Sequence, residues 1–155
     1  MAEQERKGPD KSAIGIEGVP FEMEVERGKI REFARATMSD NPDYIDATNP
    51  VSPPTFLQTS AFWTPSGSSP FAKIKMDMRR LLHGGQEFVF PGPPPRAGTK
   101  LSAQTRVEDV YEKEGKRGGT MTFVVTVTDY RDETGAVVAQ SRGTAIQTGR
   151  APGEA

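Results

Sequence analysis

The sequence contains no cysteine and a single histidine, His83. The absence of cysteine excludes disulfide bonds, thiolate metal sites and a cysteine nucleophile. A centre built from several histidines is excluded as well, and we expect no metal site. The glycine-rich loops that bind nucleotide phosphates, of the Walker or the dinucleotide type, are also missing. We therefore expect no cofactor.

The sequence also lacks an excess of charge of either sign. Its 20 basic and 21 acidic side chains give a formal net charge of −1, which provides no positive field to bind nucleic acid or an anionic membrane. No apolar run approaches the roughly 18 residues of a membrane span, and residues 1–7 have no apolar segment typical of a secretory signal. These absences predict a cytoplasmic protein that binds neither nucleic acid nor membrane.

The length of 155 residues fits one domain with a sizeable core. Residues 1–13 are charged and contain Gly8-Pro9, which predicts a disordered arm. Residues 150–155 are interpreted as a disordered tail in the same way. The predicted domain therefore covers residues 14–149.

The stretch from Ser52 to Trp63 is the part around which the predicted fold is organised. Pro53 or Pro54 fits the first turn of a helix, where a missing N–H is harmless. The apolar residues that follow leave no wide polar face, which is typical of a buried helix. They are Phe56, Leu57, Ala61, Phe62 and Trp63. We predict one long central helix over about residues 54–63, and a loss of roughly 3–5 kcal/mol when Phe62 is replaced by Ala if Phe62 is fully buried. The alternative is one packing helix among several.

Apolar and polar residues alternate, or apolar residues gather, in five further segments that we predict to be strands. These segments are 21–25, 86–90, 101–108, 121–127 and 136–148. The apolar set of the fourth segment is Met121, Phe123, Val125 and Val127. A helix is predicted over 27–38 and a hairpin turn over 132–135, while 71–82 is either a short helix or an irregular flap. Strands joined by turns pair antiparallel, so the predicted class is α+β, with an antiparallel sheet wrapped around a central helix.

Few residues have the chemistry of a catalytic site. A lone histidine such as His83 is more often structural than functional. Gly84 and Gly85 precede a predicted strand and permit either the close approach of a ligand or a β-bulge. Several large apolar residues are candidates to line a ligand channel, although Phe56 and Phe62 are also typical of a plain core. The candidates are Phe56, Phe62, Trp63, Met76 and Met78.

The segment from Phe33 to Tyr44 resembles the hydratase motif of the MaoC-like family, the (R)-specific enoyl-CoA hydratases and hydroxyacyl dehydratases. Ser52 to Phe56 resembles the start of that family's hot-dog helix. Residues 82–88 and 97–101 resemble its second strand and the turn that follows. The sequence is most similar to the N-terminal MaoC-like, or FAS1-like, dehydratase domain, over about residues 15–149. This resemblance implies a single hot-dog fold.

The family's catalytic motif, Gly-Asp-x-Asn-Pro-x-His, is incomplete in this sequence. When the motif is aligned on Asn41 and Pro42, Met38 stands for the glycine, Ser39 for the aspartate and Tyr44 for the histidine. The reaction needs an acid/base pair, and a tyrosine phenol with an ordinary pKa of about 10 is a poor base at neutral pH. We therefore expect no catalytic residue in this chain. Asp40, one position away from the aspartate, and His83 remain the alternative candidates.

The resemblance implies a subunit that has lost the catalytic pair and that shapes the acyl tunnel of a heteromeric enoyl-CoA hydratase or 3-hydroxyacyl-thioester dehydratase. Its ligand would be a thioester of coenzyme A or of acyl carrier protein. Its assembly would be a homodimer, or a heterodimer with a catalytic subunit. The substrate-binding candidates are Asn41, Tyr44, Pro54, Thr55, Phe56, Trp63, Gly84, Gly85 and Gln86.

Two alternatives remain open at the level of the sequence. The first is a self-sufficient homodimeric enzyme, either a hydratase that uses Asp40 and His83 or a thioesterase. The second is a stand-alone module that binds a lipid or an acyl thioester without an enzymatic partner.

Overall fold

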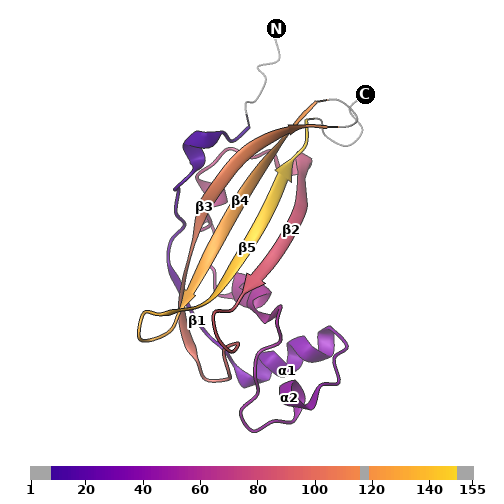
Figure 1. The fold of residues 1–155 in the computed structure, drawn as a ribbon, viewed down its shortest axis with the longest axis vertical. Coiled ribbons are helices and arrows are strands. Elements are labelled where there is room, and N and C mark those ends of the chain that lie inside the picture. The colour runs from indigo at the N-terminus through magenta and orange to yellow at the C-terminus, as the bar shows by residue number, and fades with distance from the viewer. Residues whose placement is uncertain (1–7, 116–118, 150–155) are drawn as a thin grey trace.

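In the computed structural model, the five strands form one curled antiparallel sheet with the order β1-β3-β4-β5-β2 (Figure 1). The structure describes residues 8–115 and 119–149; residues 1–7 of the predicted arm and the predicted tail at 150–155 lie outside this part of the chain. The strands are β1 Phe21–Glu24, β2 Leu81–Val89, β3 Lys100–Glu114, β4 Thr120–Arg131 and β5 Val137–Gln147. β1 and β2 are the edge strands, and the predicted hairpin turn at 132–135 joins β4 to β5, as expected.

The described helices are short and all precede β2 in the chain. The α-helices are α1 Arg27–Ala36 and α2 Pro42–Ile45, and they lie together beyond one end of the sheet (Figure 1). The 3-10 helices are η1 Lys11–Ala13, η2 Phe56–Phe62, η3 Pro70–Ala72 and η4 Met78–Arg80. No helix in the described part of the chain is long and apolar enough to cross a membrane.

Two apolar clusters lie on one face of the sheet, which we call the inner face because η2 packs on it. The first core cluster gathers Phe21, Met23, Val25, Ile30, Phe56, Leu57, Leu101, Ala103, Tyr130 and Ala139. The second core cluster gathers Ala13, Ile74, Val107, Val110 and Val124. The rings of Phe56 and Phe33 meet edge to face with centroids 5.8 Å apart, so the first cluster connects η2 to α1. The opposite side of the sheet is the outer face.

The central helix differs from the prediction. It is a 3-10 helix of seven residues, which has about 3.0 residues per turn instead of about 3.6. A 3-10 helix rises about 2.0 Å per residue, against about 1.5 Å in an α-helix, so Phe62 lies farther from Phe56 than expected. Phe62 is 79% exposed, with the Lys29 ammonium 5.5 Å from its ring centroid. The predicted burial of Phe62, and with it the large loss of stability on truncation, is therefore wrong.

In β4 the apolar set does not lie on the inner face. Tyr130 lies opposite Ala103 of β3 and Ala139 of β5, so Tyr130 belongs to the inner face. Successive side chains of a strand point to opposite faces, which places Thr126 and Thr128 on the inner face. The valines and phenylalanine of the predicted apolar set therefore point outward. The Val127 side chain points outward and is nevertheless buried, because Arg106 of β3 and Arg142 of β5 lie directly opposite Val127 in the neighbouring strands.

Three further differences concern the ends of elements. The predicted disordered arm is ordered from residue 8, and Ala13 of η1 packs into the second core cluster. The segment 71–82 contains the end of η3 and all of η4, and β2 begins at Leu81, earlier than predicted. The register between β2 and β5 shifts between His83 and Gly85, so the glycine pair forms a bulge. A Cβ on Gly84 would lie 2.7 Å from the Ile146 side chain, which explains the need for glycine there.

Candidate functional site

The motif segment, residues 38–44, begins with a turn that closes α1. The Ser39 N–H donates to the Ala34 carbonyl at 2.8 Å, and the Met38 N–H donates to the Arg35 carbonyl at 3.0 Å. This is the Schellman pattern, which requires a left-handed residue that is most often glycine. Met38 takes that position with a φ of 55°. Met38 therefore adopts a conformation that glycine adopts most easily, at the position where the resembled motif has glycine.

Polar groups then order the rest of the motif segment. The Ser39 Oγ accepts from the Asn41 N–H at 3.4 Å. The Asn41 Oδ1 accepts from the Asp43 N–H at 2.9 Å and so caps α2. The half-buried Tyr44 packs against the first core cluster. The segment is thus well ordered, but it places a hydroxyl and a phenol where a general acid and a general base would be needed.

A pocket of about 450 Å³ lies between η2 and the inner face of the sheet. Its size is within the range of small-molecule sites, roughly 300–1,000 Å³. It is bounded by the loop before β1, by the segment from η2 to η3, and by β3, β4, β5 and β2. The lining side chains that carry oxygen are Gln58, Ser60, Thr64, Ser68, Ser69, Gln86, Thr105, Thr126, Thr128, Tyr130 and Ser141.

Several of these oxygens hydrogen-bond to one another. The Thr105 and Thr128 hydroxyls are 2.7 Å apart, and the Tyr130 hydroxyl donates to the Ser60 Oγ at 3.0 Å. Burial raises the pKa of the Tyr130 phenol, while its hydrogen bond with Ser60 acts in the opposite direction. Among the described residues that line the pocket, none is Asp, Glu, His, Lys or Arg. The pocket therefore has the groups to bind a ligand and lacks a group that exchanges protons near neutral pH.

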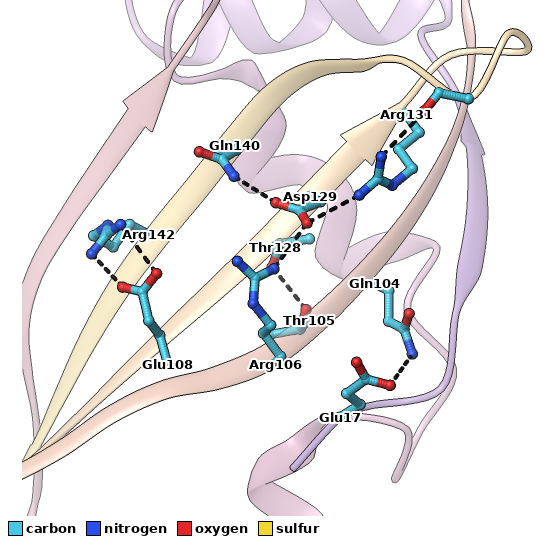
Figure 2. A network of polar contacts seen from close by, with 11 residues as sticks. Glu17, Gln104, Thr105, Arg106, Glu108, Thr128, Asp129, Arg131, Gln140 and Arg142 are labelled. Atoms are coloured by element: carbon cyan, nitrogen blue, oxygen red, sulfur yellow. Dashed lines mark hydrogen bonds and ion pairs between the residues drawn. The ribbon is translucent and has the colours of Figure 1, made fainter. Parts of the chain in front are cut away.

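The outer face carries a network of ion pairs and amide contacts (Figure 2). At its centre is the mostly buried Asp129, whose Oδ2 accepts from Arg106 at 2.9 Å and from Arg131 at 3.4 Å. The Asp129 Oδ1 accepts from the Gln140 amide at 2.6 Å. Arg142 binds the Glu108 carboxylate nearby. Because each of these arginines faces a carboxylate, the network holds the surface of the sheet together without a concentration of one charge.

A model of one protein family, the FAS1-like dehydratase domain region, matches residues 12–141 of this chain. The chain belongs to this FAS1-like dehydratase family. A relative in Streptomyces coelicolor, a UPF0336 protein, is 32% identical over 115 residues, which cover 68% of this chain and 76% of the relative. The family membership predicted from the motif segment is therefore confirmed.

Solved structures show the same fold. The C-terminally truncated HadBC complex of Mycobacterium tuberculosis, a 3R-hydroxyacyl-ACP dehydratase, matches with a TM-score of 0.67 and 25% identity over 86% of this chain and 98% of that chain. The ChsH1–ChsH2 complex of the same organism matches with a TM-score of 0.70 and 17% identity over 91% of this chain and 88% of that chain. A further match is a MaoC-like dehydratase from Rhodospirillum rubrum, with a TM-score of 0.60 and 19% identity over 89% of this chain and 94% of that chain. The predicted hot-dog fold of this FAS1-like dehydratase domain is confirmed.

The structure does not bring the predicted substrate-binding residues into one place. Gln86 lines the pocket under η2, and Trp63 lines a separate hollow at the end of β1 and β3. Asn41 and Tyr44 belong to the motif segment described above. Phe56 lies in the first core cluster. Pro54 and Thr55 lie at the exposed start of η2, and Gly84 and Gly85 form the β2 bulge.

The alternative catalytic candidates and most of the channel candidates lie elsewhere. Asp40 and His83 are exposed, and neither lines the pocket under η2. Met78 and Phe62 are exposed and Met76 packs on the second core cluster, and none of these three channel candidates lines the pocket under η2. In the described part of the chain, no cluster of three or more His, Asp or Glu side chains is arranged to hold a metal ion.

The sequence analysis missed the hydroxyl-bearing residues of the pocket. The signal was available in β4, where Thr126 and Thr128 alternate with Val125 and Val127. Threonine and valine are both β-branched and both suit a strand, so the pattern alone does not say which set faces inward. Only the register, which places Tyr130 opposite Ala103, decides it.

Proposed function

We propose that this chain is the acyl-thioester-binding, non-catalytic subunit of a heteromeric enoyl-thioester hydratase or 3-hydroxyacyl-thioester dehydratase. The acyl group lies in the pocket between η2 and the inner face of the sheet. The proton transfers are performed by an Asp/His pair on the motif segment of a related partner subunit. This chain supplies the shape and the polarity of the acyl site.

One observation carries the proposal. The chain has a ligand-sized pocket lined by hydroxyl and amide groups, and no ionisable acid or base other than the phenol of Tyr130 lines it in the described structure. Burial makes the Tyr130 phenol harder to ionise because it raises the pKa. The motif segment keeps its turn, but Ser39 and Tyr44 occupy the acid/base positions. A binding role therefore fits the chain better than a self-sufficient reaction.

The open edge of the sheet at β2 is the surface that we expect the partner subunit to bind. β2 pairs with β5 alone in the described structure, so its other side is an open edge, and open edges pair readily with other strands. Leu82 and Val89 of β2 and the neighbouring Met78 are exposed apolar residues. Two of the similar structures, HadBC and ChsH1–ChsH2, are complexes. These features support a dimer formed through β2, with a catalytic subunit as the partner.

The test measures hydration of crotonyl-CoA by the purified chain, by a co-expressed partner that carries the Asp/His pair, and by their complex. We expect only trace activity from the chain alone and full activity from the complex. Replacing the partner's aspartate or histidine should lower turnover by about 10²–10⁴-fold, the usual contribution of a positioned proton-transfer group. The variants Asp40→Asn and His83→Ala should leave turnover of the complex within about threefold, because both residues lie outside the pocket.

Loss of turnover in Asp40→Asn or His83→Ala, with the complex intact by size-exclusion chromatography, would place the catalytic groups in this chain and overturn the proposal. Turnover by the chain alone would do the same and would favour a self-sufficient enzyme. Tight binding of an acyl-CoA by a chain that activates no partner would instead identify a stand-alone binding module.

A further inference from the structure

We propose that the pocket under η2 selects acyl groups that carry an uncharged oxygen, a hydroxyl or a keto group, beyond the β-carbon of the thioester, and that it discriminates against plain alkyl chains. This inference rests on the proposed function, because it assumes that an acyl thioester enters this pocket. It names the class of acyl group, which the proposed function leaves open.

Polar residues interrupt the inner face between its two apolar clusters. Two neighbouring rows of residues lie directly opposite one another across β3, β4, β5 and β2. One row contains Thr105, Thr128 and Ser141 and ends at Phe88 of β2, and the next contains Val107, Thr126, Gly143 and Gln86. The row on one side, Ala103, Tyr130 and Ala139, is apolar apart from one phenol. The row on the other side contains Val110, Val124 and Ala145 and ends at the exposed His83 of β2. We call the two rows between them the polar wall of the pocket; further oxygen-bearing side chains line the pocket from the η2–η3 segment.

This wall keeps unused hydrogen-bonding capacity. The Gln86 amide Nε2 donates to the Ser141 Oγ at 2.7 Å, and this contact leaves the carbonyl oxygen of Gln86 as an acceptor. No group in the described part of the chain donates to that oxygen. A hydroxyl has one donor and two acceptor lone pairs, so the paired hydroxyls of Thr105 and Thr128 also retain acceptor positions.

Gly143 opens a space beside these groups. A Cβ at this position would lie 3.3 Å from the Gln86 Oε1 and 3.5 Å from the Thr126 Oγ1. Both oxygens therefore border the volume that a side chain at Gly143 would fill. A ligand hydroxyl placed there can donate to Gln86 and accept from Thr126.

Apolar side chains line other parts of the pocket, beside the polar residues of the η2–η3 segment. Phe21 of β1, Leu57 of η2 and Phe71 of η3 line the same pocket and suit the carbon chain of an acyl group. A plain alkyl chain would displace water from the polar wall without replacing its hydrogen bonds, which is unfavourable. A carboxylate would enter a pocket whose described lining contains no cation, which is more unfavourable still. An uncharged, oxygen-bearing chain can contact the apolar side chains and form hydrogen bonds with the polar wall.

The experiment compares two thioesters of equal chain length, hexanoyl-CoA and 5-hydroxyhexanoyl-CoA, by isothermal titration calorimetry. Binding is measured on the purified chain and on its complex with the catalytic partner. We expect 5-hydroxyhexanoyl-CoA to bind at least about tenfold more tightly, because its hydroxyl replaces hydrogen bonds that the alkyl chain removes.

Three variants assign the effect to the polar wall. Thr126→Val keeps the shape of the side chain and removes its hydroxyl, and should reduce the preference to below about threefold. Gly143→Ala fills the space between Gln86 and Thr126 and should abolish the preference. Thr144→Val is the matched control, because Thr144 lies opposite Val125 on the outer face, and it should leave the preference unchanged. Thermal melts confirm that each variant is folded.

The outcomes separate the two proposals. Equal binding of the two thioesters, tighter binding of hexanoyl-CoA, or a preference that Thr126→Val and Gly143→Ala leave intact would overturn this inference and leave the proposed function standing. Failure of both thioesters to bind, to the chain and to the complex, would overturn the proposed function together with the inference.

Discussion

The motif segment at the end of α1 and the pocket under η2 differ in what each contributes to a possible reaction. The motif segment has an ordered turn with Met38 in the left-handed position, but Ser39 and Tyr44 are not suited to transfer protons. The pocket is lined by many hydroxyl and amide groups, which can form hydrogen bonds and do not titrate near neutral pH. The difference shows that the shape of a catalytic loop and the chemistry of a ligand site depend on separate residues. Each can therefore be changed while the other is kept.

The largest effect is expected at Phe56, which supports both regions. Its ring is fully buried and meets Phe33 of α1, while the adjacent Leu57 lines the pocket. Phe56→Ala should lower the free energy of unfolding by about 3–5 kcal/mol, measured by denaturant titration. A loss below about 1 kcal/mol would mean that the two regions do not share this support.

A smaller effect is expected at Tyr130, which affects the pocket and not the motif segment. Tyr130→Phe removes the hydroxyl that bonds to Ser60 and should lower the free energy of unfolding by about 0.5–1.5 kcal/mol at pH 7. An unchanged free energy of unfolding in matched denaturant titrations would show that this hydrogen bond is not a stabilising part of the pocket wall.

The same variant has a defined pH dependence. Burial raises the pKa of Tyr130, so the folded protein holds this proton more tightly than the unfolded chain does. The stability that Tyr130 contributes is fully present below the unfolded pKa of about 10 and is lost as the pH rises through the folded pKa. The advantage of the wild type over Tyr130→Phe should therefore shrink above about pH 10. An advantage that grows with alkaline pH would contradict the assigned burial.

Met38 allows the motif segment to be tested without the pocket. A left-handed conformation costs a residue with a side chain about 1–2 kcal/mol. Glycine avoids this steric cost, but it loses more backbone entropy on folding, which offsets part of the gain. The Met38 side chain is 93% exposed, so little packing is lost on truncation. Met38→Gly should raise the free energy of unfolding by about 0.5–1 kcal/mol. Met38→Ala is the control and should stay near the wild type, because alanine retains the strain; equal stability of all three proteins would contradict the left-handed turn.

The smallest effect is expected at Phe62, which belongs to neither region. Phe62→Ala should change the free energy of unfolding by no more than about 0.5 kcal/mol, because the ring is exposed and contacts Lys29. The same denaturant titrations that are used for Phe56→Ala measure it. A loss of more than about 1 kcal/mol would restore the buried position that the sequence predicted.

The sequence predicted the elements of this fold well where one local signal was decisive. The alternation of β3 gave the correct inner residues, with Leu101, Ala103 and Val107 all buried. The 132–135 turn has the expected left-handed glycine at its end, with a φ of 85° at Gly135. The motif segment and its order along the chain predicted the family and the hot-dog fold, both of which the comparisons confirm.

The pocket could not be predicted from the sequence, for physical reasons. Its lining comes from segments that are far apart in the chain, and register decides which side chains face it. In β4 the choice between the threonines and the valines depends on Arg106 and Arg142, which flank the outward Val127 and allow an apolar residue to be buried on the outer face. The position of Phe62 depends on whether η2 is an α-helix or a 3-10 helix. Both choices are made by tertiary contacts.

The network on the outer face has a kinetic consequence. Arg106, Arg131 and Arg142 each lie against a carboxylate (Figure 2), so an anionic thioester that approaches this side of the sheet meets no attractive long-range field. Electrostatic steering raises association rates well above about 10⁵–10⁶ M⁻¹s⁻¹ only where the potentials of the two partners are complementary. Encounters through this face should therefore be slow and nearly independent of ionic strength, and any salt-sensitive capture of the ligand must begin elsewhere on the molecule or on its partner.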